Sequence, residues 1–341
     1  MKIGLIARCE YARGLSLQSK NFYDNVPVDR VLLIRMPRVD CAERPDWYPN
    51  ATHIEYDARD WTLPERQVRE WMDGLDVVFS VETPYDWQLP KWAREQGVKT
   101  VIQGNPEFVR HGMKGYEHFQ HPTEWWWPTS WRLDRLPPGI VMPVPMPDVA
   151  PNTGRGDKLR VMHTTGKRAF QDRNGTDIFV AALNVLSCDV HVSAFGLDHS
   201  LPELPRPKGW TMTVEQQGVE DRWTMYDDQD VLIMPRRYGG LSLPALEAAA
   251  RGVAVLMPDI SPNESLAQLR ITPRRSLRIN LPCGVVDSYD TSYMDLATMI
   301  CHLSQNPEKV ATARSRALRD VPRWATWRQI YIDELERVCA G

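Results

Sequence analysis

The segment from Met234 to Leu266, MPRRYGGLSLPALEAAARGVAVLMPDISPNESL, constrains the fold more than any other part of the chain. It starts where a short apolar run, Asp230 to Met234, ends at a proline, and the length and content of that run predict a buried strand. Gly239 and Gly240 predict a tight turn, and the apolar-faced run from Leu243 to Arg251 predicts a helix. Another apolar run follows, so the segment predicts a strand, a turn, a helix and a second strand.

The glycine turn and the start of the predicted helix form a place that suits an anion. The first turn of a helix carries unpaired N–H groups and the positive end of the helix dipole, so the backbone at Gly240, Leu241 and Ser242 can hold a diphosphate. Glu247 lies about one turn inside the helix, where its carboxylate can accept hydrogen bonds from both hydroxyls of a ribose. The same pattern also fits an ordinary turn that leads into a core helix.

The composition is that of a globular chain. It has 341 residues, 43% hydrophobic and 25% charged, enough for two domains of about 150 residues each. MKIGLIA predicts a first buried strand rather than a signal peptide, because the apolar run stops at Arg8, and no apolar stretch predicts a membrane span. The six scattered cysteines predict reduced thiols in a cytoplasm, and the formal charge of -3 gives no global attraction to nucleic acid.

Strand-like runs alternate with helix-like runs in both halves, which is typical of parallel sheets covered by helices on both faces. The first half is predicted to hold strands at Lys2–Ala7, Arg30–Arg35, His53–Tyr56, Asp76–Val81 and Lys99–Ile102, and helices at Pro64–Asp73 and Trp87–Gln96. The second half is predicted to hold strands at Leu159–His163, Val190–Phe195, Trp210–Val214, Asp230–Met234 and Val253–Met257, and helices at Thr176–Leu186 and Leu243–Arg251. Between them, the proline-rich stretch Leu136–Gly156 predicts a linker.

The segment that begins at Met234 resembles the signature of family 4 glycosyltransferases of the GT-B fold, for which P-S-x-x-E-G-F-G-L-P-x-x-E-A-x-x-x-G-x-P-V is a typical wording. The residues in register are Pro235, Gly240, Leu243, Pro244, Leu246, Glu247, Ala248, Gly252 and Val255. Glu264 stands where the family often has a further glutamate, whereas Gly239 replaces the first glutamate of the family's pair. The resemblance covers most of residues 158–339 and, more loosely, the N-terminal half.

The resemblance implies an α/β fold of two Rossmann-like domains that face each other across a cleft. Residues 1–150 would form the N-terminal acceptor domain, and residues 151–322 would form the C-terminal nucleotide-sugar domain. Residues 323–341 would form a closing helix that packs back on the first domain, since Ala325, Thr326 and Trp327 resemble the F-S-W start of that helix in the family.

The resemblance also implies a donor site in the second domain. Two cations beside a diphosphate stabilise the charge that grows on the leaving nucleotide, and two basic residues occupy the family's places for them. The diphosphate site is thus predicted to comprise Lys167, Arg173, Gly240, Leu241 and Ser242. Glu247 is predicted to bind the donor ribose. Because the first glutamate is replaced, we expect Tyr238 or the backbone at Gly239 to contact the donor sugar.

The acceptor is expected on the first domain. YARGLSLQS, which contains Arg13 and Gly14, resembles the family's glycine-containing loop, and Glu82 and Asn105 each follow a strand at the edge where open α/β sheets bind ligands. Both polar residues are equally well explained as structural. The acceptor side is predicted to comprise Arg13, Gly14, Glu82, Asn105, Arg110 and His111.

The stretch from Arg110 to Arg132 gathers three of the eight histidines and four of the thirteen tryptophans. Its histidines, at positions 111, 118 and 121, lack a helical zinc spacing and a nearby cysteine, so no metal site is expected. Trp125 to Trp127 are expected in a long loop with their rings in the domain core.

The family resemblance implies transfer of a sugar, with retention of configuration, from a nucleotide-diphosphate sugar such as a UDP-sugar to a hydroxyl acceptor, without a cofactor or metal. Double displacement needs a carboxylate nucleophile, whereas in front-face attack the leaving phosphate takes the proton of the acceptor. The sequence favours front-face attack, because Gly239 removes one carboxylate and Glu247 is assigned to ribose.

The acceptor stays open between a saccharide or small molecule and a hydroxylated base in DNA. YGGLSLP resembles glycosyltransferases encoded by bacteriophages, some of which glycosylate their genomes, and the expected location is the cytoplasm of a bacterial cell, including a phage-infected one. A DNA acceptor requires a basic groove, for which the candidates are Arg8, Arg13, Arg110, Lys114, Arg132 and Arg135. A third alternative is a nonhydrolysing nucleotide-sugar epimerase or a donor-binding regulator on the same fold.

Overall fold

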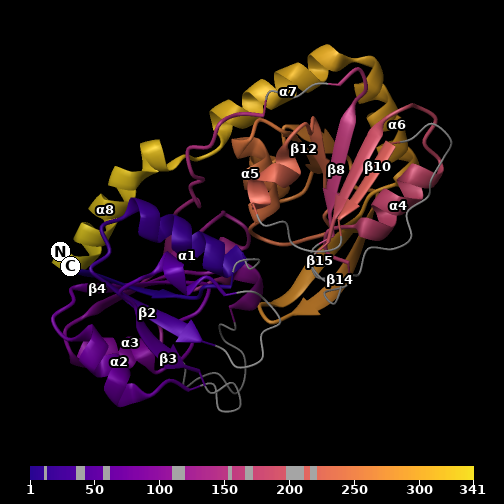
Figure 1. Ribbon diagram of the computed structural model, residues 1–341. Coiled ribbons are helices and arrows are strands. Elements are labelled where there is room, and N and C mark those ends of the chain that lie inside the picture. Colours follow the sequence, from indigo (N-terminus) through magenta and orange to yellow (C-terminus); the bar gives the residue numbers. More distant parts are fainter. Residues whose placement is uncertain are drawn as a thin grey trace. The chain divides into compact units, whose positions relative to one another are not determined.

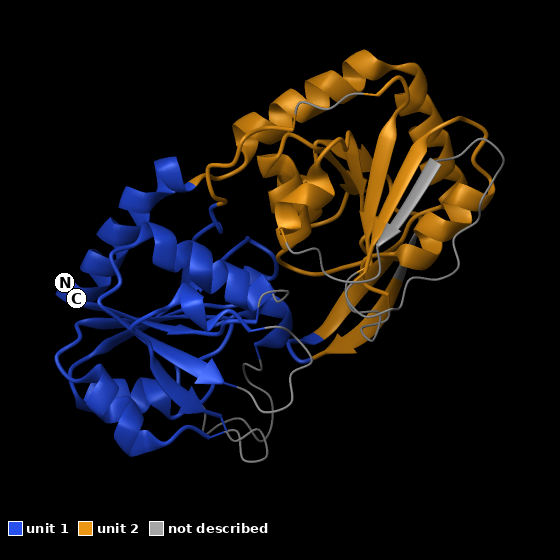
Figure 2. Ribbon diagram, in the orientation of Figure 1, with its two compact units in different colours: residues 1–145, 282–284, 324–341 blue, residues 146–281, 285–323 orange. Residues whose placement is uncertain are grey.

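The computed structural model describes residues 1–10, 14–35, 43–56, 62–109, 120–152, 156–165, 172–196, 211–215 and 221–341. The chain forms two compact units (Figure 2). Unit 1 comprises residues 1–145, 282–284 and 324–341, and unit 2 comprises residues 146–281 and 285–323. The chain therefore passes from unit 1 to unit 2 inside the proline-rich stretch, and it returns to unit 1 for its last helix.

Unit 1 is built on a seven-stranded sheet of order β3-β2-β1-β4-β5-β6-β7, whose strand pairs are all parallel. Its strands are β1 (Ile3–Ala7), β2 (Arg30–Arg35), β3 (Thr52–Glu55), β4 (Val77–Val81), β5 (Lys99–Gln103), β6 (Glu124–Trp127) and β7 (Gly139–Val141). Its helices are α1 (Gly14–Asn25), α2 (Glu65–Met72), α3 (Leu89–Glu95) and α8 (Trp324–Ala340), with 3-10 turns η1 (Pro45–Trp47), η2 (Pro106–Phe108) and η3 (Leu133–Arg135). The helices and strands predicted in the first half are present, with ends that differ by one or two residues.

Both faces of the first sheet are covered by helices, because alternate residues of a strand point to opposite faces. Ile3 and Leu5 of β1 pack in a cluster with Phe22 of α1 and Tyr331 of α8. Ile6, which points the other way, packs in a second cluster with residues of α2 and α3. The last helix therefore supplies part of the core of unit 1, and both ends of the chain lie in this unit (Figure 1).

The expectation of a loop at Trp125 to Trp127 is wrong, since these residues form strand β6 between β5 and β7. Their rings are in the core as expected, with Trp126 and Trp127 both 0% exposed. Trp126 lies edge-on to Tyr331 on one face of the sheet, whereas Trp125 and Trp127 stack at 5.0 Å on the other. Such alternation suits a strand buried on both sides, where large aromatic residues are favourable.

Unit 2 repeats this plan with a six-stranded parallel sheet of order β10-β9-β8-β11-β12-β13. Its strands are β8 (Arg160–Thr164), β9 (His191–Phe195), β10 (Thr211–Glu215), β11 (Val231–Ile233), β12 (Ala254–Pro258) and β13 (Leu269–Ile271). Its helices are α4 (Thr176–Asn184), α5 (Leu243–Ala250), α6 (Tyr293–Gln305) and α7 (Pro307–Asp320), with 3-10 turns η4 (Arg222–Tyr226) and η5 (Asn263–Ser265). A hairpin of β14 (Arg275–Leu281) and β15 (Gly284–Asp290) follows β13.

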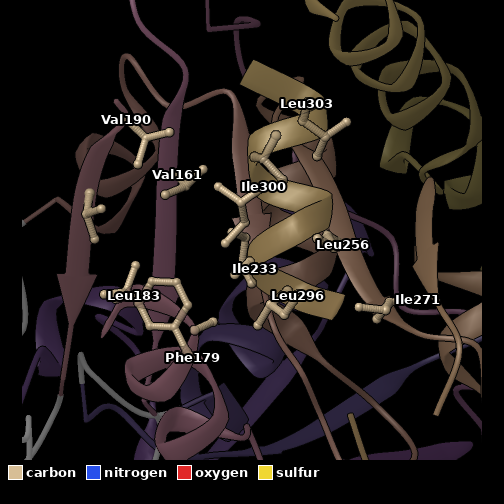
Figure 3. Close-up of a cluster of buried hydrophobic side chains, with 14 of the residues drawn as sticks. Val161, Phe179, Leu183, Val190, Ile233, Leu256, Ile271, Leu296, Ile300 and Leu303 are labelled. Carbon is tan, nitrogen blue, oxygen red and sulfur yellow. The ribbon is translucent and has the colours of Figure 1, made fainter. Parts of the chain in front are cut away.

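The core of unit 2 lies between its sheet and the pair α4 and α6 (Figure 3). Phe179 and Leu183 of α4 and Leu296 and Ile300 of α6 pack against strand residues such as Ile233. The helices and strands predicted in the second half are present with ends shifted by one or two residues. Among the described residues, every helix is too short or too polar to cross a bilayer.

Candidate functional site

The turn between β11 and α5 leads directly into the start of α5. Ser242 is the N-cap residue of α5, but its side chain makes no capping hydrogen bond. Its hydroxyl instead donates to the thioether sulfur of Met234 at 3.7 Å, a weak acceptor. The Ser242 side chain therefore does not use the first N–H groups of α5, which are the groups that bind anions at the start of a helix.

Gly239 has a backbone conformation that favours glycine. Its φ of 121° lies in a region that L side chains rarely adopt. A glutamate at position 239 would therefore strain the turn. The glycine at this position allows the observed backbone conformation. The adjoining Tyr238 is 3% exposed, and its carbonyl oxygen accepts a hydrogen bond from Arg236 at 3.0 Å.

A second predicted segment adjoins this turn. The backbone N–H of Arg237 donates to the carbonyl of Arg173 at 2.9 Å, and the side-chain amide of Asn174 donates to the Thr164 carbonyl at the end of β8. Gly175, with φ 71°, packs directly on the carbonyl of Pro235, where no side chain would fit. The fold therefore brings Arg173 and the glycine turn, which are far apart in the sequence, to one edge of the second sheet.

Arg237 fixes this arrangement and was not singled out from the sequence. Its guanidinium bonds Asp290 of β15 at 3.0 Å, the Asp172 carbonyl at 2.8 Å and the carboxylate of Asp177 at 2.8 Å. Burial works against its charge, but the hydrogen bonds to Asp177 and Asp290 outweigh burial and raise the pKa of Arg237. Arg237 thus ties the glycine turn to the Arg173 turn, the start of α4 and the hairpin.

The side chain of His163 stabilises the same edge of the second sheet through two buried hydrogen bonds. The Ile233 carbonyl can only accept, so the Nδ1–H of His163 donates to it at 2.8 Å and Nε2 accepts from the Thr176 hydroxyl at 3.0 Å. The ring is 0% exposed and stacks on Phe179. Burial lowers the pKa of His163 to about 4, so the ring is neutral at pH 7. It holds the start of α4 against the end of β11.

Glu247 is the carboxylate of α5, and it is 6% exposed. Its Oε2 accepts a hydrogen bond from the Tyr226 hydroxyl at 2.9 Å, and its Oε1 lies 3.0 Å from Nε of Arg222. Burial raises the pKa of Glu247, and the charge of Arg222 and the hydrogen bond from Tyr226 oppose that rise. Both partners belong to η4, a segment that the sequence did not mark.

The other residues that the sequence predicts for a donor site lie around the start of α5 or outside the described residues. Gly240 is buried, Leu241 is half-buried and Ser242 is buried, all at the start of α5, whereas Lys167 lies outside the described residues. Glu264 is exposed in η5. The structure thus places Arg173 against the glycine turn and Glu247 in the helix that follows that turn.

In unit 1 the structure brings Glu82 and Asn105 together. The Asn105 side-chain amide donates to Oε1 of Glu82 at 2.9 Å, beyond the ends of β4 and β5. Glu82 has a φ of 63°, which is uncommon for a residue with a side chain and often marks a functional site. Gly14 is the first residue of α1, and the other predicted acceptor residues, Arg13, Arg110 and His111, lie outside the described residues.

Arg8 and Glu10 form a polar cluster beside this pair. The guanidinium of Arg8 bonds both oxygens of Glu10, at 2.8 and 2.9 Å, and the Ser16 hydroxyl donates to the same carboxylate. Glu10 is 2% exposed, so the ion pair is largely withdrawn from water. Arg135 lies 3.0 Å from Asp134, on the surface. Among the described residues, no group of three or more His, Cys, Asp or Glu side chains could hold a metal ion.

No protein-family model and no curated protein matches this chain. Solved structures are similar over nearly its whole length. The Anabaena HepE protein in complex with UDP-glucose has a TM-score of 0.67 at 12% identity, covering 99% of this chain and 100% of that one. Sucrose-phosphate synthase from Thermosynechococcus elongatus has a TM-score of 0.66 at 12% identity, covering 100% and 99%. A glycosyltransferase from Rickettsia africae has a TM-score of 0.67 at 10% identity, covering 99% and 98%.

These similarities concern the fold. Together with the two parallel sheets, they confirm the predicted fold class, an α/β protein with two Rossmann-like units of the GT-B type.

Proposed function

We propose that the protein is a glycosyltransferase that moves a sugar from a nucleotide-diphosphate sugar to a hydroxyl acceptor. The observation that carries this proposal is the start of α5, which its N-cap residue leaves uncapped, with Arg173 beside the preceding turn and Glu247 one helical turn inside. Similar structures of HepE hold UDP-glucose or UDP. A site with backbone donors, a cation and a buried carboxylate suits the diphosphate and ribose of such a donor.

Each group has a distinct task in this proposal. The backbone N–H groups at Gly240, Leu241 and Ser242 bind the diphosphate, and Lys167 and Arg173 neutralise its charge. Glu247 binds the ribose. The backbone at Gly239, or the adjoining Tyr238, contacts the donor sugar.

The transfer proceeds with retention, by front-face attack and without a metal. The bond between the sugar carbon and the diphosphate oxygen breaks, the acceptor oxygen bonds to that carbon from the same face, and the leaving diphosphate takes the acceptor proton. Fixed positive charge from Arg173, Lys167 and the α5 dipole stabilises the leaving group. Glu247 is engaged by Tyr226 and Arg222, which argues against a role as nucleophile.

The acceptor we propose is a saccharide or another small hydroxyl compound. Glu82 and Asn105 present a carboxylate and an amide, groups that bind hydroxyls well. Two of the arginines that a DNA groove would need are engaged by carboxylates, Arg8 by Glu10 and Arg135 by Asp134. These pairings favour the small acceptor over a phosphate backbone, which requires available cations.

Thermal unfolding with UDP-, GDP- and ADP-sugars tests the donor, because a ligand that binds the native state raises the Tm by mass action. The expected result is stabilisation by one nucleotide class, and NMR of the product should show the anomeric configuration of the donor. Arg173→Ala should lower kcat/KM by about a hundredfold, with Arg274→Ala, an exposed arginine paired with Asp295, as the matched control. Donor turnover without a glycosylated product would contradict the proposal.

A further inference from the structure

The pairing of Glu247 with η4 points to a selectivity that goes deeper than the proposed function on which it rests. We propose that Arg222 and Tyr226 keep the Glu247 carboxylate ionised and oriented, so that it accepts one hydrogen bond from each hydroxyl of a ribose 2′,3′-diol. The site would then select ribonucleoside diphosphate donors over 2′-deoxy donors. Arg222 and Tyr226 are positioning residues in this scheme, since Glu247 alone meets the diol.

The count of acceptor positions supports this assignment. An ionised carboxylate has about two acceptor positions on each oxygen. Tyr226 uses one on Oε2, through its hydroxyl at 2.9 Å, and Arg222 lies against Oε1 at 3.0 Å. By this count η4 leaves one position on each oxygen unused, and 8% of the Glu247 side chain is exposed. Two neighbouring acceptor positions match two neighbouring hydroxyls.

The two η4 residues contribute in different ways. Tyr226 is 0% exposed and makes a well-formed buried hydrogen bond that sets the orientation of the carboxylate. Within the described part of the chain, Nε of Arg222 makes no aligned hydrogen bond despite its short distance to Glu247, so Arg222 acts mainly through its charge. Its guanidinium lies 4.8 Å over the ring of Trp223, and Asp221 caps the segment by accepting from the Trp223 N–H.

The charge of Arg222 matters because Glu247 is buried. Burial raises the pKa of Glu247, while Arg222 and Tyr226 oppose the rise. These two are the charged and titratable groups that act on it in the described part of the chain, since Arg314 of α7, the helix beside α5, bonds Asp230 and the Gly252 carbonyl instead. The pKa of Tyr226 is raised well above its ordinary value by burial, so its hydroxyl stays a donor. A protonated Glu247 would lose one of the two acceptor positions that a diol needs.

Two consequences can be measured. A 2′-deoxy nucleotide leaves one buried acceptor of Glu247 unpaired, which should weaken binding about ten- to a hundredfold. Removal of the Arg222 charge, which opposes the rise, should raise the pKa of Glu247 further. Binding of the ribonucleotide should then weaken at low pH and recover as the pH rises.

The experiment is calorimetric titration of the full chain with UDP, GDP and ADP, followed by the 2′-deoxy form of whichever binds most tightly. Wild type, Arg222→Gln, Arg222→Lys, Tyr226→Phe and the control Arg274→Gln are compared at pH 6.5, 7.5 and 8.5. Relative to wild type at the same pH, we expect Arg222→Gln to lose about tenfold in affinity at pH 6.5 and less as the pH rises to 8.5. Arg222→Lys should keep most of the affinity, Tyr226→Phe should lose affinity equally at all three pH values, and the control should match wild type.

The outcomes separate this inference from the proposed function. Equal binding of the ribonucleotide and its 2′-deoxy form overturns the inference but leaves a nucleotide site in place. An Arg222→Gln loss that does not change with pH also overturns it, because a merely structural defect would look like that. If none of the three nucleotides binds wild type, the proposed function fails and the inference fails with it.

Discussion

Gly175 packs against the carbonyl of Pro235 so closely that a Cβ at position 175 would overlap that oxygen. This contact joins the turn that carries Arg173 to the end of β11, which continues into the glycine turn before α5. The two segments of the proposed diphosphate site therefore meet through backbone atoms. The hydrogen bonds of Arg237 and His163 then stabilise the contact between these two segments.

Gly175→Ala should destabilise unit 2 and weaken donor binding. The change adds strain at φ 71° and an overlap with Pro235, together about 3 kcal/mol of unfolding free energy. Gly74→Ala is a matched control, because Gly74 has the same φ of 71° and no atom within 4 Å of the added Cβ, so it should cost about 1 kcal/mol. Urea unfolding of the two variants measures both losses of unfolding free energy. Equal losses in the two variants would show that the Pro235 contact does not matter.

The stability of unit 2 should fall as the pH drops from 6.5 toward 4 because of His163. Its pKa is about 4 in the folded chain and 6.5 in the unfolded chain, so protons bind preferentially to the unfolded state. The contribution of His163 to the free energy of unfolding is complete above pH 6.5 and decreases by about 3 kcal/mol as the pH approaches 4. His163→Gln removes the titrating group. Urea unfolding at pH 7 and pH 5 should show a smaller difference for the variant than for wild type, and identical differences would refute the assignment.

Arg237→Met should destabilise unit 2 by about 3 kcal/mol, because it leaves Asp172 and Asp290 without their cation. The exposed carboxylate of Asp177 contributes less, since water screens it. Arg237→Lys should recover part of the loss but not all, because an ammonium cannot reproduce the forked contacts. Chemical denaturation is the measurement, with Arg274→Met as the exposed control. A loss no larger than that of the control would mean that the contacts of Arg237 add little.

Much of the fold could be predicted from local sequence. Short apolar runs between turn residues, such as Val77–Val81, mark buried strands whether or not their neighbours are known. Helices α6 and α7 were not predicted, although Ser292 caps the first and Leu296, Ile300 and Leu303 follow its period. That signal was present in the sequence. The strand at Trp125–Trp127 was missed because three consecutive tryptophans show no polar alternation when both faces are buried.

The site could be predicted only in part. Glu247 and the glycine turn lie in one continuous segment whose pattern is visible in the sequence. The contacts of Arg237 depend on Asp172, Asp177 and Asp290, which the fold collects from two other places in the chain. No local periodicity in the sequence encodes contacts between such distant residues. The contacts of Arg222 and Tyr226 with Glu247 could not be predicted for the same reason.

Glu82→Gln should weaken use of the acceptor while leaving the donor site unchanged. Glu82 lies in unit 1, where Asn105 donates to its Oε1, and an amide in its place presents one acceptor oxygen instead of two. We expect the KM for the acceptor to rise about tenfold, with no change in the Kd of the nucleotide. Asp134→Asn, which removes an exposed carboxylate of the same unit, is the control. Steady-state kinetics with varied acceptor and titration with nucleotide separate the two effects. A raised nucleotide Kd, or an unchanged acceptor KM, would remove Glu82 from the acceptor side, because a hydroxyl-binding carboxylate must act on the acceptor alone.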